Sequence, residues 1–450
     1  MPSSSAAATP PIVIDALLSE YPFPGFLDPV RKRAAEFERA HPEYRINVRG
    51  CYYEDLPTEV SRETLAGRPP TIASYYSGAS QQAIDTVTAD GHPLFTSVAR
   101  EIGGRTEILG HPVVVDDLVD ACDDFYRIGG EIVAVPLTLS TMLLYTNASL
   151  LRDAGVAAIP STWDELTSAC EAVARLDGGP AHAITWPNDG KLFQQAVAQQ
   201  GGLLLDNDNG RAGRATTVDL TTPELMAYVQ WWRDLHQRGL FLHTGGLEDW
   251  VGSGTAFVER KVAFRVGSSF ESGFMGQAAA EAGFELAVSV LPHNGRVAPA
   301  GNWVGGDALW LAEGLDAATR DGALAFIQYL NTAEHAAEWH RTIGSTPVTK
   351  GAVALLEREG WFAEHPVHHV ATRQLDRTDR SPGASTPVYP GSHGIQRAVM
   401  EAMADVLEQG AEPGARFARA SAEAQKALDH YTATCLGEGP RDPGWTAVGS

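Results

Sequence analysis

Long apolar runs are missing from this chain of 450 residues. No stretch of about 18 consecutive apolar residues, the length that a membrane-spanning helix needs, occurs in it. We therefore expect no membrane span. Hydrophobic residues still make up 44% of the sequence. That share lets a chain of this length bury sizeable cores in about two or three domains.

Basic residues are also scarce relative to acidic ones. The chain has 34 Lys and Arg against 56 Asp and Glu, which gives a formal net charge of −22. Phosphate backbones and anionic lipid surfaces attract the opposite balance. We expect neither nucleic acid nor an anionic membrane surface as a partner.

Cysteines are few and isolated. Cys51, Cys122, Cys170 and Cys435 lie far apart and form no CxxC pair, so a zinc or redox motif is not supported. Core or surface thiols are the favoured interpretation, while one disulfide stays open.

Enzyme motifs are absent as well. The sequence has no GxxxxGK[ST], strand-linked GxGxxG, GxSxG or HExxH motif. The run HPVHH offers His365, His368 and His369, which are metal ligands by residue type. Because the three lack a fixed helical spacing, we interpret the run as a solvated loop. The sequence thus predicts no enzyme activity, cofactor or metal.

The N-terminal run MPSSSAAATPP has neither a basic segment nor an apolar core, so it does not match a signal peptide. Its composition is typical of a flexible linker, and we expect flexible tails over 1–10 and 438–450. Two hypotheses fit this run. Either an export signal has been removed from a protein that works outside the cytoplasm, or the protein is cytoplasmic.

Strand and helix patterns alternate along the chain, starting with IVIDAL at 12–17, a charged amphipathic helix over 26–41 and the strand RINVRGCYY. Later, Thr162 and Glu165 form a capping-box pattern before the helix WDELTSACEAVARL. This alternation predicts an α/β fold with at least two sheets.

Several predicted strands end in small or hydroxyl-bearing residues. Examples are Tyr76-Ser77-Gly78, Thr138-Leu139-Ser140, Gly267-Ser268-Ser269 and Gly305-Gly306. Such ends let a polar ligand approach the backbone at the carboxyl edge of a sheet. The alternative is that they are ordinary strand-to-helix turns with capping serines.

Three stretches in order resemble the family-1 extracellular solute-binding proteins, and among them the glycerol-3-phosphate-binding branch. They are VPLTLSTMLLYTNASLLRDAG with the following PSTWDEL, then WVGGDALWLAEG, then NTAEHAAEWHRTIGSTPVTKGA. Together they extend the resemblance from about residue 12 to about residue 431.

The resemblance implies a type II periplasmic-binding fold with a ligand cleft between two lobes. The N-terminal lobe would comprise 11–138 plus 304–344, and the C-terminal lobe 139–303 plus 345–437. The protein would be a monomer that captures a small polar ligand and delivers it to the membrane subunits of an ABC permease. It would be extracytoplasmic and anchored as a lipoprotein. The alternative is a cytoplasmic relative acting as an enzyme or sensor.

The resemblance also implies the ligand-binding residues. They are Tyr52, Tyr53, Ser77, Ser140, Trp186, Asp189, Ser268, Ser269, Gly305, Gly306, Ser345 and Tyr389.

Three of these residues depart from the branch. Tyr389 stands where the branch has a phosphate-binding arginine, Ser77 replaces a glutamate and Ser345 replaces a tyrosine. A phosphate needs charge-assisted donors, usually from arginine, and Arg265 is the one substitute we consider. We therefore expect a neutral polyol or oligosaccharide, with a choline-type head group as second fit through its contact with aromatic faces.

Overall fold

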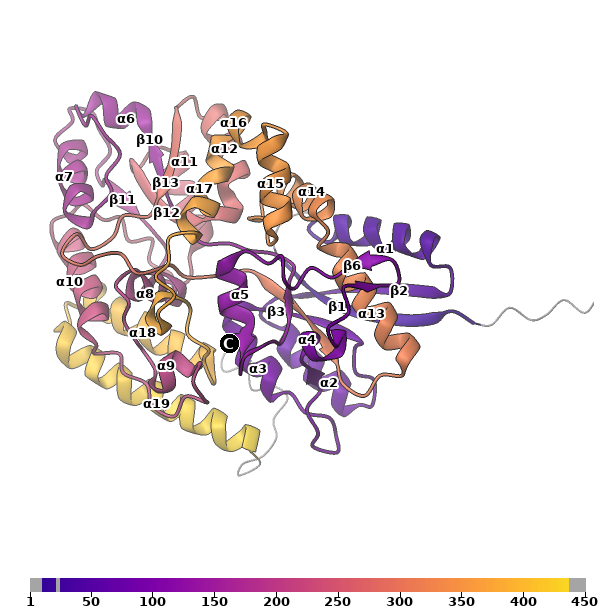
Figure 1. Cartoon of the computed structure of the whole chain (residues 1–450). Helices are drawn as coiled ribbons and strands as arrows, with labels where there is room; N and C mark the ends of the chain where they lie inside the picture. The colour runs from indigo at the N-terminus through magenta and orange to yellow at the C-terminus, as the bar shows by residue number, and fades with distance from the viewer. Residues whose placement is uncertain (1–9, 22–24, 437–450) are drawn as a thin grey trace, which may run out of the picture.

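The computed structural model describes residues 10–21 and 25–436, and it contains two α/β lobes (Figure 1). In the first lobe the strand order is β2-β1-β3-β14-β4, with β9 paired to β14. In the second lobe it is β11-β12-β10-β13. Each lobe has its own sheet and its own core, which confirms the predicted two-lobed α/β fold.

In the first sheet, β1, β2 and β3 run parallel and β14 runs antiparallel to β3. The parallel strands therefore end at the edge where β14 begins. The strands are β1 (Ile12–Glu20), β2 (Tyr44–Tyr52), β3 (Ile72–Tyr76), β4 (Phe95–Thr96), β9 (Val135–Pro136) and β14 (Asp307–Ala312).

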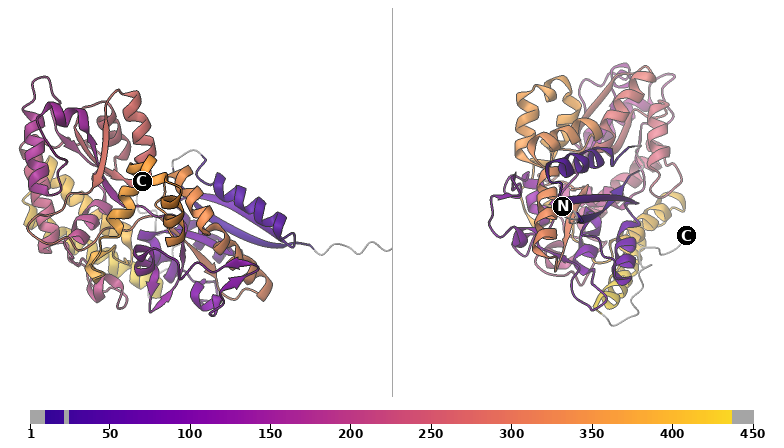
Figure 2. Two further views of the ribbon diagram at one scale, coloured as in Figure 1. Left: turned by 45° about the horizontal axis from the view of Figure 1, so that its top comes forward. Right: turned by 90° about the vertical axis from the view of Figure 1, so that its right-hand side faces the viewer.

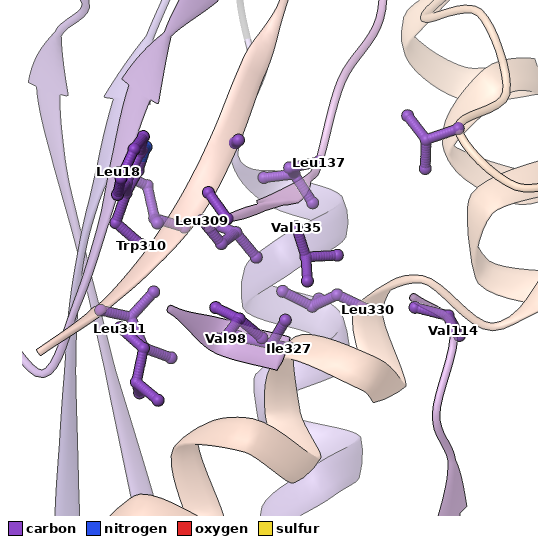
Figure 3. Close-up of a cluster of buried hydrophobic side chains, with 14 of the residues drawn as sticks. Leu18, Val98, Val114, Val135, Leu137, Leu309, Trp310, Leu311, Ile327 and Leu330 are labelled. Carbon is purple, nitrogen blue, oxygen red and sulfur yellow. The ribbon is translucent and has the colours of Figure 1, made fainter. Parts of the chain in front are cut away.

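Helices cover the faces of this sheet. Figure 3 shows how Leu18, Leu309 and Ile327, from two strands and a helix, meet in the core of the first lobe. The helices are α1 (Asp28–Ala40), α2 (Leu56–Leu65), α3 (Ser80–Asp85), α4 (Val98–Ile102), α5 (Asp120–Tyr126), α13 (Ala317–Leu330), α14 (Ala333–Ile343) and α15 (Lys350–Arg358).

In the second sheet, β10 lies between β12 and β13 and is antiparallel to both. Two views turned from that of Figure 1 show α19 running along this lobe (Figure 2). The strands are β10 (Met142–Asn147), β11 (Ile184–Thr185), β12 (Phe264–Ser268) and β13 (Leu286–Val290). The helices are α6 (Ala148–Asp153), α7 (Trp163–Ala174), α8 (Gly190–Gln199), α9 (Asp206–Gly210), α10 (Pro223–Gln237), α11 (Trp250–Val258), α12 (Ser272–Glu281), α17 (Pro366–Leu375), α18 (Ser392–Glu408) and α19 (Pro413–Leu436). The short helix α16 (Trp361–Glu364) contacts both α15 and α17, and its Phe362 is buried in the core of the first lobe.

Segments of the chain cross between the lobes, and hydrogen bonds join them. Ser140 N donates to Gly305 O at 3.0 Å and Gly305 N donates to Ser140 O at 2.8 Å. A third segment joins them at Ser345, whose Oγ accepts a hydrogen bond from Leu139 N at 3.0 Å. The crossing segments are therefore held as one unit.

Glycine is required where these segments touch. A Cβ on Gly305 would lie 2.1 Å from the ring of Trp303. Gly306 has φ +104, and a Cβ there would lie 2.2 Å from Thr138 O. No side chain fits at either position, so this pair of glycines lets the segments cross closely.

The last crossing lies close to α15. Val348, Ala352 and Leu356 pack into the core of the first lobe, whereas α17 packs against β13 of the second lobe. Helix α15, which follows the crossing at residue 345, thus lies with the first lobe.

The histidine run is helical, and the expected loop is wrong. Pro366 opens α17 at its first position, and His368 and His369 follow within its first turn. A proline there is pre-organised for helix formation, and the helix is held by its packing on β13. Within residues 10–21 and 25–436, no group of three or more His, Cys, Asp or Glu side chains is placed to hold a metal ion.

All four cysteines are free thiols, with Cys122 and Cys170 buried. Among the described residues, no helix is long and apolar enough to cross a membrane. Except for Pro10, the predicted flexible tails lie outside the described residues.

The capping box at the start of α7 is confirmed, and it gives a stability prediction. Thr162 Oγ1 accepts from Glu165 N at 3.2 Å, and Glu165 Oε2 accepts from Thr162 N at 3.3 Å. We expect Thr162→Ala to lower the free energy of unfolding by about 1 kcal/mol, because a helix donor loses its acceptor. Urea unfolding followed by circular dichroism measures this change. Thr162→Ser keeps the acceptor and should match the wild type, so an equal loss in both variants would contradict the assignment.

Candidate functional site

A cavity of about 750 Å³ lies between the two lobes. The first lobe contributes the carboxyl ends of β1, β2 and β3 and the segment just before β14. The second lobe contributes the end of β12, the start of α8, and the helices α11 and α12. Parallel strands end at one edge of a sheet, so the residues that follow them gather there.

Tyrosines form the wall of the first lobe. Tyr21 and Tyr53 stack with their ring centroids 4.6 Å apart, and Tyr76 meets Tyr53 edge-on at 5.4 Å. Tyr52 lies 4.9 Å from Tyr53 and is 43% exposed. Across the cavity, Phe270 of the second lobe lies 6.0 Å from Tyr21. Aromatic rings thus line the cavity on the side of the first lobe, and they extend to Phe270 of the second lobe.

The polar floor lies where the lobes join. Ser77, Ser140 and Gly306 all line the cavity. Ser77 N donates to Gly306 O at 2.8 Å, whereas Ser77 Oγ is buried and has no hydrogen-bond partner among the described residues. A buried hydroxyl without a partner is costly unless a ligand or water satisfies it. Ser77 Oγ therefore keeps unused hydrogen-bonding capacity just beneath the floor of the cavity.

A charged pair stands at the start of α8. Asp189 caps this helix and is fully buried. Its carboxylate accepts from Lys191 Nζ at 3.2 Å and from Trp250 Nε1 at 2.9 Å. The Lys191 ammonium lies 5.9 Å from the centre of the Tyr53 ring. The cation that lines the cavity is therefore paired within the protein.

Burial and neighbouring charges shift two pKa values here. Burial acts to lower the pKa of Lys191, but the carboxylates of Asp189 and Glu248 outweigh it and hold that pKa above its usual value. Burial, and then the charge of Asp189, raise the pKa of Glu248 to about 7. Lys191 thus stays charged at neutral pH while Glu248 is only partly ionised.

Six of the sequence-predicted site residues line the cavity. They come from both lobes and from the crossing segments. These residues are Tyr52, Tyr53, Ser77, Ser140, Ser268 and Gly306.

Two of the predicted aromatic residues lie in the core of the second lobe. Trp186 is 2% exposed and packs between Trp231, at 5.4 Å, and Phe241, at 4.6 Å. Tyr389 is also buried in this core. Neither ring lines the cavity.

The other four predicted residues support the site from behind. Ser269 Oγ accepts from Thr141 N at 3.1 Å, and Gly305 and Ser345 hold the crossing segments. Asp189 lies behind Lys191 and Trp250, both of which line the cavity.

Arg265, considered as a substitute for the missing arginine, is fully buried. Its guanidinium forms an ion pair with Glu271 and donates to Trp250 O at 3.4 Å. Its positive charge is thus paired with a carboxylate inside the second lobe.

Several residues that line the cavity are not among those that the sequence predicted. Tyr21 directly follows β1 and Tyr76 is the last residue of β3, so the strand-end rule that selected Ser77 points to both positions. Lys191 stands two residues after Asp189. Trp250 and Trp303 carried no signal, because only the tertiary packing decides which tryptophans face the cavity.

The comparisons with known proteins decide the family. The model for bacterial extracellular solute-binding proteins matches residues 32–368. This chain belongs to that family. The sn-glycerol-3-phosphate-binding periplasmic protein UgpB of Yersinia pestis is 24% identical over 382 residues, which cover 84% of this chain and 82% of that protein. UgpB of Salmonella typhimurium is 23% identical over 383 residues, with the same coverage.

Solved structures share the fold. The cyclic alpha-maltosyl-1,6-maltose binding protein from Arthrobacter globiformis has a TM-score of 0.75 and 20% identity, covering 93% of this chain and 100% of that one. UgpB from Mycobacterium tuberculosis in complex with glycerophosphocholine has a TM-score of 0.71 and 21% identity, covering 94% and 100%. An extracytoplasmic location fits the family. The comparisons give no support to the alternative of a cytoplasmic enzyme or sensor.

The raised pKa of Glu248 predicts a pH dependence of stability. Because the folded state favours the protonated form, this stabilisation is present below about pH 4.5 and is lost as the pH rises through about 7. Glu248→Gln mimics the protonated form. We expect it to melt at a higher temperature than the wild type at pH 8 and at a similar temperature at pH 4.5.

Melting curves at both pH values check this difference. Glu259→Gln, which changes an exposed glutamate at the cavity rim, is the matched control and should follow the wild type. A Glu248→Gln effect of equal size at both pH values would contradict the assignment.

Proposed function

We propose that this protein is the capture subunit of an ABC importer for a neutral, hydroxyl-rich solute, either a carbohydrate or a glycerol derivative. The ligand binds reversibly in the cavity, the lobes close around it, and the protein delivers it to the permease. The protein acts as a monomer, is held outside the cytoplasm as a lipoprotein, and is not an enzyme.

The combination of groups around the cavity carries this proposal. Tyrosine faces can pack against the C–H surface of a sugar or polyol. At the floor, the Ser77 hydroxyl and nearby backbone groups can exchange hydrogen bonds with ligand hydroxyls. Pockets for small ligands generally combine apolar walls with a few placed polar groups.

The charges in the cavity favour a neutral ligand over an anion. Within the described residues, Lys191 is the one Lys or Arg side chain that lines the cavity, and it is paired with Asp189. Three glutamates also line the cavity, Glu259, Glu271 and Glu281. Glu259 is paired with Lys261 and Glu271 with Arg265. A phosphate would find no uncommitted cation there.

The named ligands of similar proteins support the same class. The solved structures include complexes with maltose, maltotetraose and ribitol, at 16% to 19% identity and TM-scores of 0.68 to 0.70. These ligands are all uncharged and rich in hydroxyls.

A glycerophosphodiester is the second candidate. The Mycobacterium tuberculosis structure holds glycerophosphocholine, and the Lys191 ammonium is placed at the cavity wall. The tyrosine faces could receive a quaternary ammonium group.

Tyr52 gives a test of the binding site. We expect Tyr52→Ala to weaken binding about tenfold, because an aromatic contact is worth about 0.5–1.5 kcal/mol beyond its buried area. The melting temperature without ligand should change little, since Tyr52 is 43% exposed and lies outside the buried core. Isothermal calorimetry with the sugars and polyols that bind in a thermal-shift screen measures the affinity.

Trp186→Phe is the matched control for an aromatic residue outside the cavity. It should lower the melting temperature while leaving the affinity within about twofold, because it alters only core packing. The proposal would be overturned if the thermal-shift screen finds no ligand. It would also be overturned if X-ray scattering shows no closure of the lobes when a ligand is bound.

Lys191→Gln separates the two ligand classes. For a neutral polyol or sugar we expect a loss of about threefold or less, because the ammonium is already paired with Asp189. For glycerol-3-phosphate or glycerophosphocholine the loss should exceed tenfold, since a hydrogen bond to a charged group is worth about 1.5–3 kcal/mol. Calorimetry on the same panel decides between the classes.

A further inference from the structure

The two most exposed large hydrophobic residues of the described chain lie at the same cavity. Val251 is 81% exposed and Phe274 is 63% exposed. Both line the cavity on the side of the second lobe. Single exposed apolar residues are common on proteins, so the surroundings of this pair decide its meaning.

The helices that carry these residues have almost no charge. α11 has the sequence WVGSGTAFV, with no charged residue, and α12 has the sequence SGFMGQAAAE, with a single charge at its end. A helix on a protein surface ordinarily keeps a polar face toward water. On these two helices the exposed polar side chains are few, namely Thr255 on α11 and Gln277 and Glu281 on α12.

The spacing places the apolar residues on the cavity side. Val251, Thr255 and Val258 of α11 line the cavity, as do Phe274, Gln277, Ala278 and Glu281 of α12. These positions recur every three or four residues, as residues on one face of a helix do.

The opposite faces pack into the protein, with Phe257 and Ala279 buried in one cluster, and the two helices contact each other. Together they form a groove that is lined mainly by apolar side chains, with Thr255, Gln277 and Glu281 as its polar members.

This groove is continuous with the polar floor. Val251 and Phe274 share one cavity with Ser77, Lys191 and Gly306. One elongated molecule can therefore touch both. Sugar hydroxyls laid against valine, alanine and phenylalanine would lack hydrogen-bond partners, which is costly.

We infer that the α11–α12 groove is an outer subsite for an apolar group, such as an alkyl chain or aryl ring, attached to the hydroxyl-rich part of the solute. This inference deepens the proposed function and rests on it. The solute is then an amphiphile: its polar end lies on the floor, and its apolar end lies between the two helices. Burial of each methylene in such a groove strengthens binding by about fourfold.

Methyl, butyl and hexyl β-D-glucosides, kept below their micelle concentrations, are the probes. Titrations are followed by NMR of isotope-labelled valine and methionine methyl groups. We expect hexyl glucoside to bind at least tenfold more tightly than methyl glucoside, with shifts at Val251, Val258 and Met275. Equal affinities, or shifts spread over distant exposed valines such as Val13, would overturn the inference.

Variants test the assignment to the groove. V251S combined with F274S should remove most of the gain with chain length, whereas V297S, at an exposed valine outside the cavity, should keep it. A gain that persists in the double variant would overturn the inference. So would a double variant that changes the ligand-free radius of gyration in X-ray scattering, because the other lobe would then cover the groove.

The outcomes for the subsite and for the function are distinct. If a hydrophilic solute from the thermal-shift screen binds but alkyl substitution adds nothing, the outer subsite is overturned and the proposed function stands. If hexyl glucoside shifts the Val251 and Val258 methyl groups while no hydrophilic solute binds, the subsite stands and the proposed function fails.

Discussion

Ser140 and Gly305 exchange two backbone hydrogen bonds at the point where the chain crosses between the lobes. The exchange depends on close approach, because a side chain on Gly305 would collide with Trp303 and with Ser140 Oγ. Trp303 lines the cavity and Ser140 forms part of its floor. The same contact thus determines where the lobes join and which groups a ligand meets.

Much of the fold could be predicted from the sequence, because the strands and helices obey local rules. The β1–α1–β2 opening and the capping box of α7 follow from alternation and from the Thr162–Glu165 spacing. The prediction of a loop for the histidine run was wrong. A proline followed by polar residues resembles a loop when it is not known that the segment packs against β13. Local sequence patterns determine most helices and strands, whereas contacts between residues far apart in the sequence decide the ambiguous segments.

The site was harder to predict, because residue type does not fix the direction of a side chain. Strand ends could be located, and Ser77, Tyr53 and Ser268 do line the cavity. Trp186 and Trp303 are chemically identical and both are buried in the core of the second lobe, yet only Trp303 also lines the cavity. Which one turns inward depends on neighbours such as Trp231 and Phe241, far away in sequence.

Polar and apolar groups lie at different parts of the cavity. Its floor consists of crossing segments, where Ser77 N binds Gly306 O and Ser140 binds Gly305, so a ligand hydroxyl there touches the segments that connect the lobes. The groove of α11 and α12 belongs to one lobe alone. A change in the angle between the lobes alters the position of the groove relative to the tyrosines of the first lobe. Contacts at the floor therefore affect closure of the lobes through the junction itself. Contacts in the groove instead affect which solutes can occupy the rest of the cavity.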